Sequence, residues 1–181
     1  MRSALVVPVK SFARAKARLA SVLDEQARAD LARQMAERVL AAAGSLPVTI
    51  ACDDEEVAEW ARRHGASVAW TPGTGLNGAV TQAVAGVDAE RVVVAHADLP
   101  KARDLMIVVG DSGVVLVPDR KRDGTNVLSL PRDAGFVFQY GPGSFEKHRA
   151  EAARLGLDVL VIEPPDLTWD VDEPGDIPTC G

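Results

Sequence analysis

The segment from Arg91 to Pro100 places the tightest constraint on how this chain can fold. It reads Arg-Val-Val-Val-Ala-His-Ala-Asp-Leu-Pro, so an uncharged apolar run is followed by one carboxylate, Asp98, and then by a proline. Such a run is typical of a strand buried on both faces, as in a parallel sheet. Because proline cannot donate to a sheet ladder, the strand should end near Asp98.

The expected position of Asp98 makes it a candidate functional residue. In open α/β sheets, ligands bind beyond the carboxyl ends of the strands, and Asp98 follows such an end. A substrate or a metal ion would then be met there. The alternative interpretation is a loop aspartate that only caps the next helix.

Similar apolar runs alternate with helical patterns along the whole chain. Strands are expected at 4–9, 48–52, 67–70, 114–117, 127–130 and 158–162, with 4–9, 114–117 and 158–162 buried, and 136–138 is compatible with a short strand. Helices are expected at 24–43, from Asp53 or Asp54 to Gly65, up to about Val87, at 102–109, and after the 141–144 loop. The alternation predicts one α/β domain over residues 1–181, built as a three-layer α/β/α sandwich around a mainly parallel, Rossmann-like sheet.

Composition narrows the class of protein. The 181 residues are enough for a full core, and the formal net charge of −6 argues against a general nucleic-acid binder. The two cysteines, Cys52 and Cys180, lack partners at metal-ligand spacing, so neither a zinc site nor a disulfide framework is expected. No apolar stretch approaches the ~20 residues that span a bilayer. We therefore expect a cytoplasmic protein, monomer or homodimer, without nucleic-acid or membrane partners.

A basic cluster follows the first predicted strand. Lys10, Arg14, Lys16 and Arg18 fall within nine residues. Cations at a strand end suit a triphosphate, although a solvated helical face would show the same pattern. The cluster contains no glycine-rich fingerprint, so the sequence supports neither a P-loop nor a Rossmann dinucleotide site.

Two glycine-containing loops precede predicted helices. The loop at 71–80 carries Asn77, whose amide could read a base edge or could simply cap the helix. The loop at 141–144 leads Ser144 into a helix start, which is either an anion site or an ordinary N-cap. His148, in the following helix, is expected at the surface, with a position facing the site as the alternative.

Two further carboxylates, Asp170 and Asp172, lie near the end of the chain. They alternate, so an extended segment would point them to opposite sides. One of them could reach a metal ion while the other caps the turn at Pro174.

In order along the chain, these motifs resemble the 2-phospho-L-lactate / phosphoenolpyruvate guanylyltransferase family of coenzyme F420 biosynthesis. That family shares its fold with the molybdenum-cofactor guanylyltransferases. The resemblance extends over nearly the whole chain and rests on segments 7–10, 15–19, 75–77, 96–100, 123–126, 141–144 and 169–174. One departure is Ser11-Phe12-Ala13, where many members of the wider superfamily have glycines.

The resemblance implies a role for each matching residue. Asp98 and Lys16 would be catalytic. The GTP contacts would be Pro8, Val9, Lys10, Lys16, Leu76 and Asn77. The acceptor contacts would be Thr125, Gly141 and Ser144. The ligands of Mg²⁺ would be Asp98, Asp170 and Asp172.

The resemblance also implies the reaction. GMP would pass from GTP to a phosphorylated three-carbon acid, first of all phosphoenolpyruvate, giving enolpyruvoyl-2-diphospho-5'-guanosine and pyrophosphate. 2-Phospho-L-lactate and 3-phosphoglycerate are alternative acceptors. A phosphate monoester is already largely dianionic at neutral pH, so the nucleophile needs charge neutralisation rather than a general base.

Two other classes of function compete with this interpretation. A nucleotide-sugar glycosyltransferase would commonly carry an Asp-x-Asp at the central strand end, where this chain has Ala97-Asp98. A nucleotide-binding protein without catalysis is disfavoured by Asp98 and Asp170, because carboxylates buried close together without a metal repel each other.

Overall fold

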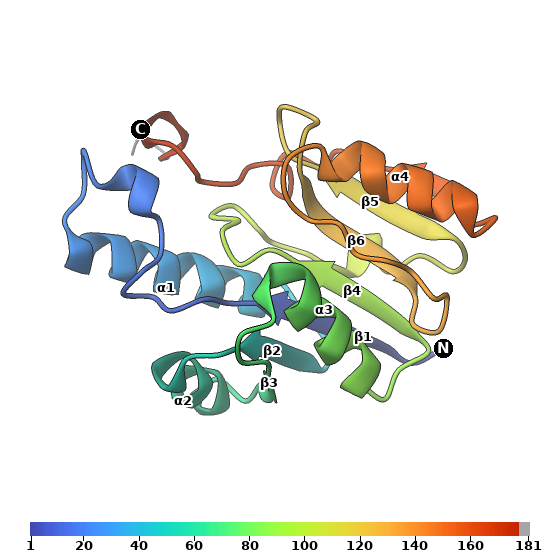
Figure 1. Ribbon diagram of the computed structural model, residues 1–181, viewed down its shortest axis with the longest axis horizontal. Helices are drawn as coiled ribbons and strands as arrows, with labels where there is room; N and C mark the ends of the chain where they lie inside the picture. Colours follow the sequence, from blue (N-terminus) through green and yellow to red (C-terminus); the bar gives the residue numbers. More distant parts are fainter. Residues whose placement is uncertain (178–181) are drawn as a thin grey trace.

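Strand β4 (Arg91–Ala95) lies at the centre of a seven-stranded sheet in the computed structural model, which describes residues 1–177 (Figure 1). Cys180 lies outside the described residues. The order across the sheet is β3-β2-β1-β4-β6-β5-β7. The other strands are β1 (Ser3–Pro8), β2 (Val48–Cys52), β3 (Ser67–Trp70), β5 (Val114–Pro118), β6 (Thr125–Pro131) and β7 (Val159–Val161).

The sheet is mixed but mainly parallel. Strand β1 pairs in parallel with β2 and with β4, β2 with β3, and β5 with β7. Strand β6 runs antiparallel to its neighbours β4 and β5. The arrangement confirms the predicted α/β class and the predicted buried strand at β4, all of whose residues are buried.

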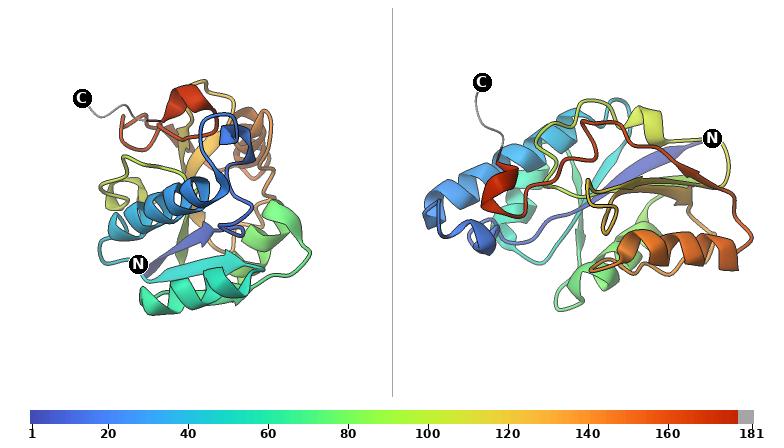
Figure 2. Two further views of the ribbon diagram at one scale, coloured as in Figure 1. Left: turned by 90° about the vertical axis from the view of Figure 1, so that its left-hand side faces the viewer. Right: turned by 90° about the horizontal axis from the view of Figure 1, so that it is seen from above.

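Helices cover both faces of the sheet (Figure 2). Successive strand residues point to opposite faces, so Leu5 and Val7 pack in one core while Ala4 and Val6 pack in the other. The first core includes α1 (Glu25–Ala41) and α2 (Glu55–Arg63). The second includes α3 (Gly75–Gly86) and α4 (Ser144–Arg154). The predicted three-layer sandwich is therefore confirmed.

Aspartate side chains begin two of these helices. Asp24 accepts a hydrogen bond from the Ala27 amide at 2.8 Å, and Asp54 accepts one from the Val57 amide at 3.2 Å. These bonds satisfy amides that have no partner within the helix. Of the two capping candidates before α2, the structure uses Asp54.

Three local predictions were wrong. The expected helix at 102–109 is only the 3₁₀ turn η2 (Met106–Val108). Residues 136–138 form no strand; the Phe136 and Phe138 rings instead pack 5.6 Å apart against the second core. The expected buried strand at 158–162 is β7, whose Leu160 is 57% exposed because β7 is an edge strand that pairs only with β5.

The order of the strands creates a switch point between β1 and β4. From β1 the chain moves outward to β2 and β3, and α3 then crosses back to β4 on the other side of β1. The carboxyl ends of the two parallel neighbours β1 and β4 therefore meet at one edge of the sheet. Ligands of open α/β sheets bind at such a point.

None of the helices formed by residues 1–177 is both long and apolar enough to cross a membrane.

Candidate functional site

Two adjoining hollows open at the switch point. Their volumes are about 220 Å³ and about 610 Å³. His96 and Asp98 line the smaller hollow, and Asp53 and Thr71 line the larger one. Residues that line both are Pro8, Val9, Lys10, Ala15, Lys16 and Leu76. Five of the six residues predicted to contact the nucleotide are thus brought together around one divided space.

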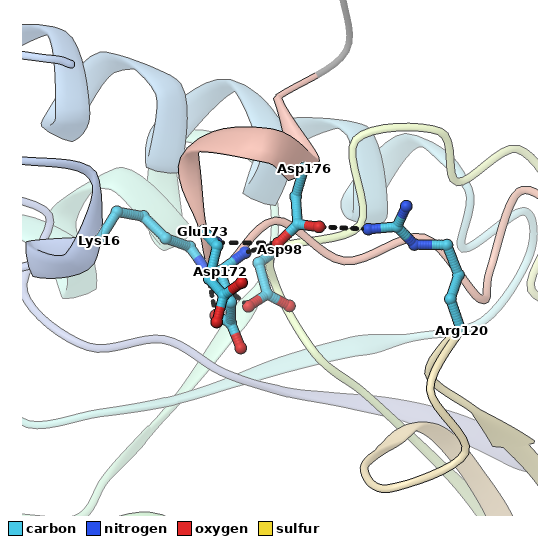
Figure 3. Close-up of polar contacts among 6 residues, drawn as sticks. All are labelled: Lys16, Asp98, Arg120, Asp172, Glu173 and Asp176. Carbon is cyan, nitrogen blue, oxygen red and sulfur yellow. Dashed lines mark hydrogen bonds and ion pairs between the residues drawn. The ribbon is translucent and has the colours of Figure 1, made fainter. Parts of the chain in front are cut away.

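Lys16 lies where these hollows meet the acidic residues. Its Nζ is 2.6 Å from Asp98 Oδ2 and 3.2 Å from Asp172 Oδ1 (Figure 3). The Lys16 side chain is only 12% exposed, whereas that of Asp172 is 51% exposed. Lys16 directly precedes the 3₁₀ turn η1 (Ala17–Leu19) and has a left-handed backbone, with φ +54°. The fold therefore joins the basic cluster, the end of β4 and the C-terminal segment in one ion-pair network.

Burial and charge oppose each other in this network. Burial by itself raises the pKa of Asp98, but the Lys16 ammonium, His96 and hydrogen bonds to the carboxylate together outweigh burial and hold that pKa below its ordinary value. Burial by itself lowers the pKa of Lys16, but Asp98 and Asp172 together raise it above the ordinary value. Both side chains are therefore charged at neutral pH.

The C-terminal segment reaches the end of β4 through a backbone bond. The Val171 amide donates to the Asp98 carbonyl at 3.2 Å, which places Asp170 and Asp172 beside Asp98. Burial, followed by the charge of Asp98, raises the pKa of Asp170 to about 6. The three predicted metal ligands Asp98, Asp170 and Asp172 thus lie close together, and their mutual repulsion contributes to the raised pKa of Asp170.

An ion pair that sequence reasoning missed holds this segment in place. Asp176 pairs with Arg120 from the loop between β5 and β6, and it also accepts the Asp172 and Glu173 amides at 3.1 and 2.8 Å (Figure 3). Glu173 and Asp176 thereby cap the turn at Pro174, so the expectation that Asp170 or Asp172 does so was wrong. Arg120 and Asp176 are 56 residues apart, and no local pattern signals the pair.

The Asn77 side chain binds the backbone of a loop that is distant in sequence. Its Nδ2 donates to the Tyr140 carbonyl at 3.2 Å, and its Oδ1 accepts the Tyr140 amide at 2.6 Å. The N-cap of α3 is Thr74, so the capping alternative for Asn77 was wrong. The Asn77 amide instead clamps the backbone just before Gly141, beside the hollow that Leu76 lines.

The predicted acceptor residues Thr125 and Ser144 are joined in the interior. The Thr125 amide donates to Ser144 Oγ at 3.0 Å, and the N-cap of α4 is Gly143, so Ser144 is not the N-cap. Gly141 is exposed in the loop before α4 and has φ +121°, a conformation that favours glycine. The 123–126 and 141–144 loops thus form one structural unit.

The His148 side chain on α4 holds that unit through hydrogen bonds. It is fully buried, so the expected surface position was wrong. Its Nε2 accepts the Gln139 amide at 3.0 Å, which leaves Nδ1 to donate to Thr125 Oγ1 at 3.0 Å. Burial lowers the pKa of His148 to about 4.

The donor set suits a metal ion that is shared with a substrate. Among residues 1–177, no group of three or more His, Cys, Asp or Glu side chains has the geometry to hold a metal ion by itself. Over the same residues, Asp98 Oδ1 is buried and has no hydrogen-bond partner. Mg²⁺ is usually held by one or two carboxylates together with phosphate oxygens and water, so the residues present fit such an ion.

Comparison with solved structures shows which fold this is. A nucleotidyl transferase from Methanothermobacter superposes with a TM-score of 0.68 at 15% identity, covering 97% of this chain and 94% of that one. Glucosyl-3-phosphoglycerate synthase from Mycobacterium tuberculosis, solved in complex with Mn²⁺ and UDP, gives a TM-score of 0.63 at 12% identity, covering 90% and 69%. At these identities the likeness shows a shared nucleotidyltransferase-type fold.

Sequence comparison shows the family. The phosphoenolpyruvate guanylyltransferase of Roseiflexus castenholzii is 36% identical over 95% of this chain and 84% of its own length. The enzyme of the same name from Rubrobacter xylanophilus is 38% identical over 95% and 90%. The model of the family described as guanylyl transferase CofC like matches residues 3–179. These matches show that the chain belongs to the CofC-like guanylyl transferase family.

Proposed function

We propose that the protein is a phosphoenolpyruvate guanylyltransferase, which transfers GMP from GTP to phosphoenolpyruvate. The observation that carries the proposal is the position of Lys16 between Asp98 and Asp172, at the junction of the two hollows. The names of the full-length relatives support the choice of both substrates. A cytoplasmic location and a monomeric or homodimeric state remain parts of the proposal.

The nucleotide would occupy the divided space at the carboxyl ends of β1 and β4. Lys10 and Lys16 line both hollows and supply cations for the triphosphate. Pro8, Val9 and Leu76 supply apolar walls for the nucleoside. Asn77 would act on the same pocket by fixing the Tyr140 backbone.

Asp98, Asp170 and Asp172 would hold Mg²⁺. Oδ1 of Asp98 is the oxygen that remains available in the network described above. When bound, Mg²⁺ supplies positive charge that neutralises the phosphates and the crowded carboxylates. The carboxylates of this chain fix its position, and Arg120 with Asp176 holds the segment that bears two of them.

In the reaction, an oxygen of the acceptor phosphate forms a bond to the α-phosphorus of GTP. The bond from that phosphorus to the oxygen bridging the α- and β-phosphates breaks, and its electron pair leaves with pyrophosphate. The acceptor phosphate is already ionised, so no proton has to be removed from it, and the proposed mechanism has no general base. Lys16 would stabilise charge that develops on the phosphates.

The acceptor would lie near the N-terminal end of α4. Thr125, Gly141 and Ser144 are its proposed contacts, in the unit that the Thr125–Ser144 hydrogen bond holds together. Gly141 is the exposed member, so its backbone is open to a carboxylate or phosphate. The amides of the first helical turn favour an anion at this end.

A pyrophosphate-release assay tests the proposal. GTP, ATP, CTP and UTP are crossed with phosphoenolpyruvate, 2-phospho-L-lactate and 3-phosphoglycerate, in the presence of Mg²⁺. We expect the highest kcat/KM with GTP and phosphoenolpyruvate, and formation of the guanylylated product by mass spectrometry. Preference for another acceptor would change the substrate assignment, and absence of turnover with every pair would refute the function.

A further inference from the structure

Lys16 occupies one oxygen of Asp98 and one oxygen of Asp172, two of the three carboxylates that are proposed to hold the divalent cation. Its Nζ contacts Asp98 Oδ2 at 2.6 Å and Asp172 Oδ1 at 3.2 Å, and its side chain is almost entirely enclosed. An ammonium group and a divalent cation repel each other and compete for the same carboxylate lone pairs. The contacts of Lys16 and those of the metal ion at these two oxygens are therefore mutually exclusive.

Lys16 also faces the space in which the triphosphate is proposed to bind. The same side chain lines both hollows, where the nucleotide phosphates are proposed to bind. A triphosphate could accept the ammonium and leave both carboxylates free. Lys10 lines the same two hollows. Within residues 1–177, it forms no ion pair with Asp98 or Asp172.

The backbone of Lys16 is also unusual. Within residues 1–177, only Lys16 and Arg122 have a positive φ without being glycine. Such conformations are disfavoured for a residue with a β-carbon and cluster at functional and switching sites. Here the strained position directs the side chain at Asp98 and Asp172.

We propose that Lys16 couples the binding of the divalent metal ion to the binding of the nucleotide. In the nucleotide-free protein, its ammonium holds Asp98 and Asp172 and weakens metal binding. A nucleoside triphosphate draws Lys16 away and releases the carboxylates to the metal ion. The inference rests on the proposed function for the nucleotide pocket, for the metal-ion site and for the choice of GTP as the triphosphate.

Reciprocity gives the proposal a second consequence. If the nucleotide strengthens metal binding by some factor, the metal ion strengthens nucleotide binding by the same factor. Part of that factor comes from direct contact between metal ion and phosphate. The part that passes through Lys16 is removed by substituting Lys16.

Titration with MnCl₂ tests the coupling without any turnover. Electron paramagnetic resonance of free Mn²⁺ gives the affinity of the nucleotide-free wild type, of Lys16→Met and of the matched control Lys10→Met, at physiological ionic strength. We expect Lys16→Met to bind Mn²⁺ about tenfold more tightly than the wild type, in the usual range of coupling between sites. Lys10→Met removes the same charge from the same hollows and should change the affinity by less than about threefold.

The titration is repeated with guanosine 5'-(α,β-methylene)triphosphate, which cannot transfer its nucleotide. The analogue should strengthen Mn²⁺ binding more in the wild type than in Lys16→Met. Unchanged Mn²⁺ affinity in nucleotide-free Lys16→Met, or an equal gain in Lys10→Met, would overturn the proposal. Thermal melting checks that each variant is folded, and Lys16→Gln replaces Lys16→Met if the latter is not.

The two proposals fail separately. Absence of pyrophosphate release would refute the guanylyltransferase function, whereas the Mn²⁺ titration of the nucleotide-free protein would still report on Lys16. Pyrophosphate release by the wild type together with unaltered Mn²⁺ binding in Lys16→Met would refute only the coupling.

Discussion

Asp98, Asp170 and Asp172 are held together by the fold although their charges repel one another. Lys16 offsets this repulsion at Asp98 and Asp172, and the pKa of Asp170 is raised to about 6 by burial and by the charge of Asp98. Like charges that a fold keeps close together are typical of a site that awaits a cation. Substitution of single carboxylates should therefore affect activity and stability in different directions.

Asp98→Asn is expected to abolish turnover and to leave the fold intact. The amide keeps the size of the side chain but removes the charge that holds Lys16 and the metal ion. Loss of one preorganised electrostatic contact of this kind lowers kcat by about 100-fold or more. Pyrophosphate release measures the rate, with thermal melting as the control; wild-type turnover by the folded variant would contradict the assignment.

Asp170→Asn is expected to stabilise the metal-free protein at neutral pH while it impairs turnover. The folded-state pKa of Asp170 lies above its unfolded value, so ionisation destabilises the fold as the pH rises through about 6. After allowance for solvent screening, we expect a gain of about 1 kcal/mol at pH 7. The gain should vanish near pH 4, where the wild-type carboxyl is protonated in the folded state. Denaturant unfolding at both pH values, without metal, measures it; an equal gain at both would rule out this cause.

At the scale of secondary-structure elements, the site depends on how α3 and α4 hold the loops between them. Asn77 on α3 binds both backbone groups of Tyr140, and His148 on α4 binds the Gln139 amide and Thr125. The segment before Gly141 is thereby fixed from two sides. Because this segment forms no strand, these side chains supply the partners that a sheet ladder would otherwise provide.

Asn77→Ala is expected to raise KM for the acceptor as well as for GTP. Loss of the clamp would release the backbone before Gly141, which belongs to the proposed acceptor site. Loss of two hydrogen bonds to backbone groups should destabilise the protein by about 1–3 kcal/mol. Steady-state kinetics with each substrate varied in turn measures the effect. A change confined to the KM of GTP would favour a direct contact between Asn77 and the base.

Because of His148, the free energy of unfolding is expected to decrease as the pH is lowered from 6.5 to about 4. Its folded-state pKa of about 4 lies below the unfolded value, so the unfolded state takes up a proton first as the pH decreases through this range. The loss approaches about 3 kcal/mol, the free energy equivalent to the shift. His148→Gln, which remains neutral, should flatten the dependence of the melting temperature on pH. An unaltered pH profile in this variant would show that other groups cause the loss.

At the scale of the whole molecule, the site joins parts of the chain that are distant in sequence. The proposed ligands would contact the ends of β1 and β4, the N-terminal part of α3, the basic cluster and the C-terminal segment. The two relatives each align with 95% of this chain, and the family model matches residues 3–179. Both matches agree with a site that is built from the whole domain. A ligand that connects these parts should stabilise the folded state as a unit.

Mg²⁺ with GTP is therefore expected to raise the melting temperature more than Mg²⁺ with CTP. At a ligand concentration of 100 times Kd, binding adds about 2.7 kcal/mol. For a domain of this size, that gain corresponds to about 5–10 °C. Differential scanning fluorimetry with each nucleotide measures the shift; equal shifts with GTP and CTP would contradict selection of guanine.

The sequence by itself determined the fold class and most of the element positions, and its resemblance to a known family implied the residues that line both hollows. The fold class and the element positions follow from local patterns: apolar runs such as 92–95 demand burial on both faces, and the aspartates at 53 and 54 predict a helix start, for which the structure uses Asp54. The local pattern also predicts where a buried strand ends, so the sequence alone makes Asp98 a candidate functional residue. The ordered motifs then indicated the family.

Only the tertiary structure decided which partners these side chains have. The pairing of Lys16 with Asp172, of Arg120 with Asp176 and of Asn77 with Tyr140 joins residues 156, 56 and 63 positions apart. His148 is buried because Thr125 and Gln139 satisfy its ring nitrogens, and Leu160 is exposed because β7 lies at the sheet edge. Such outcomes depend on distances between segments that chain topology brings together, and hydrophobic patterning carries no record of those distances.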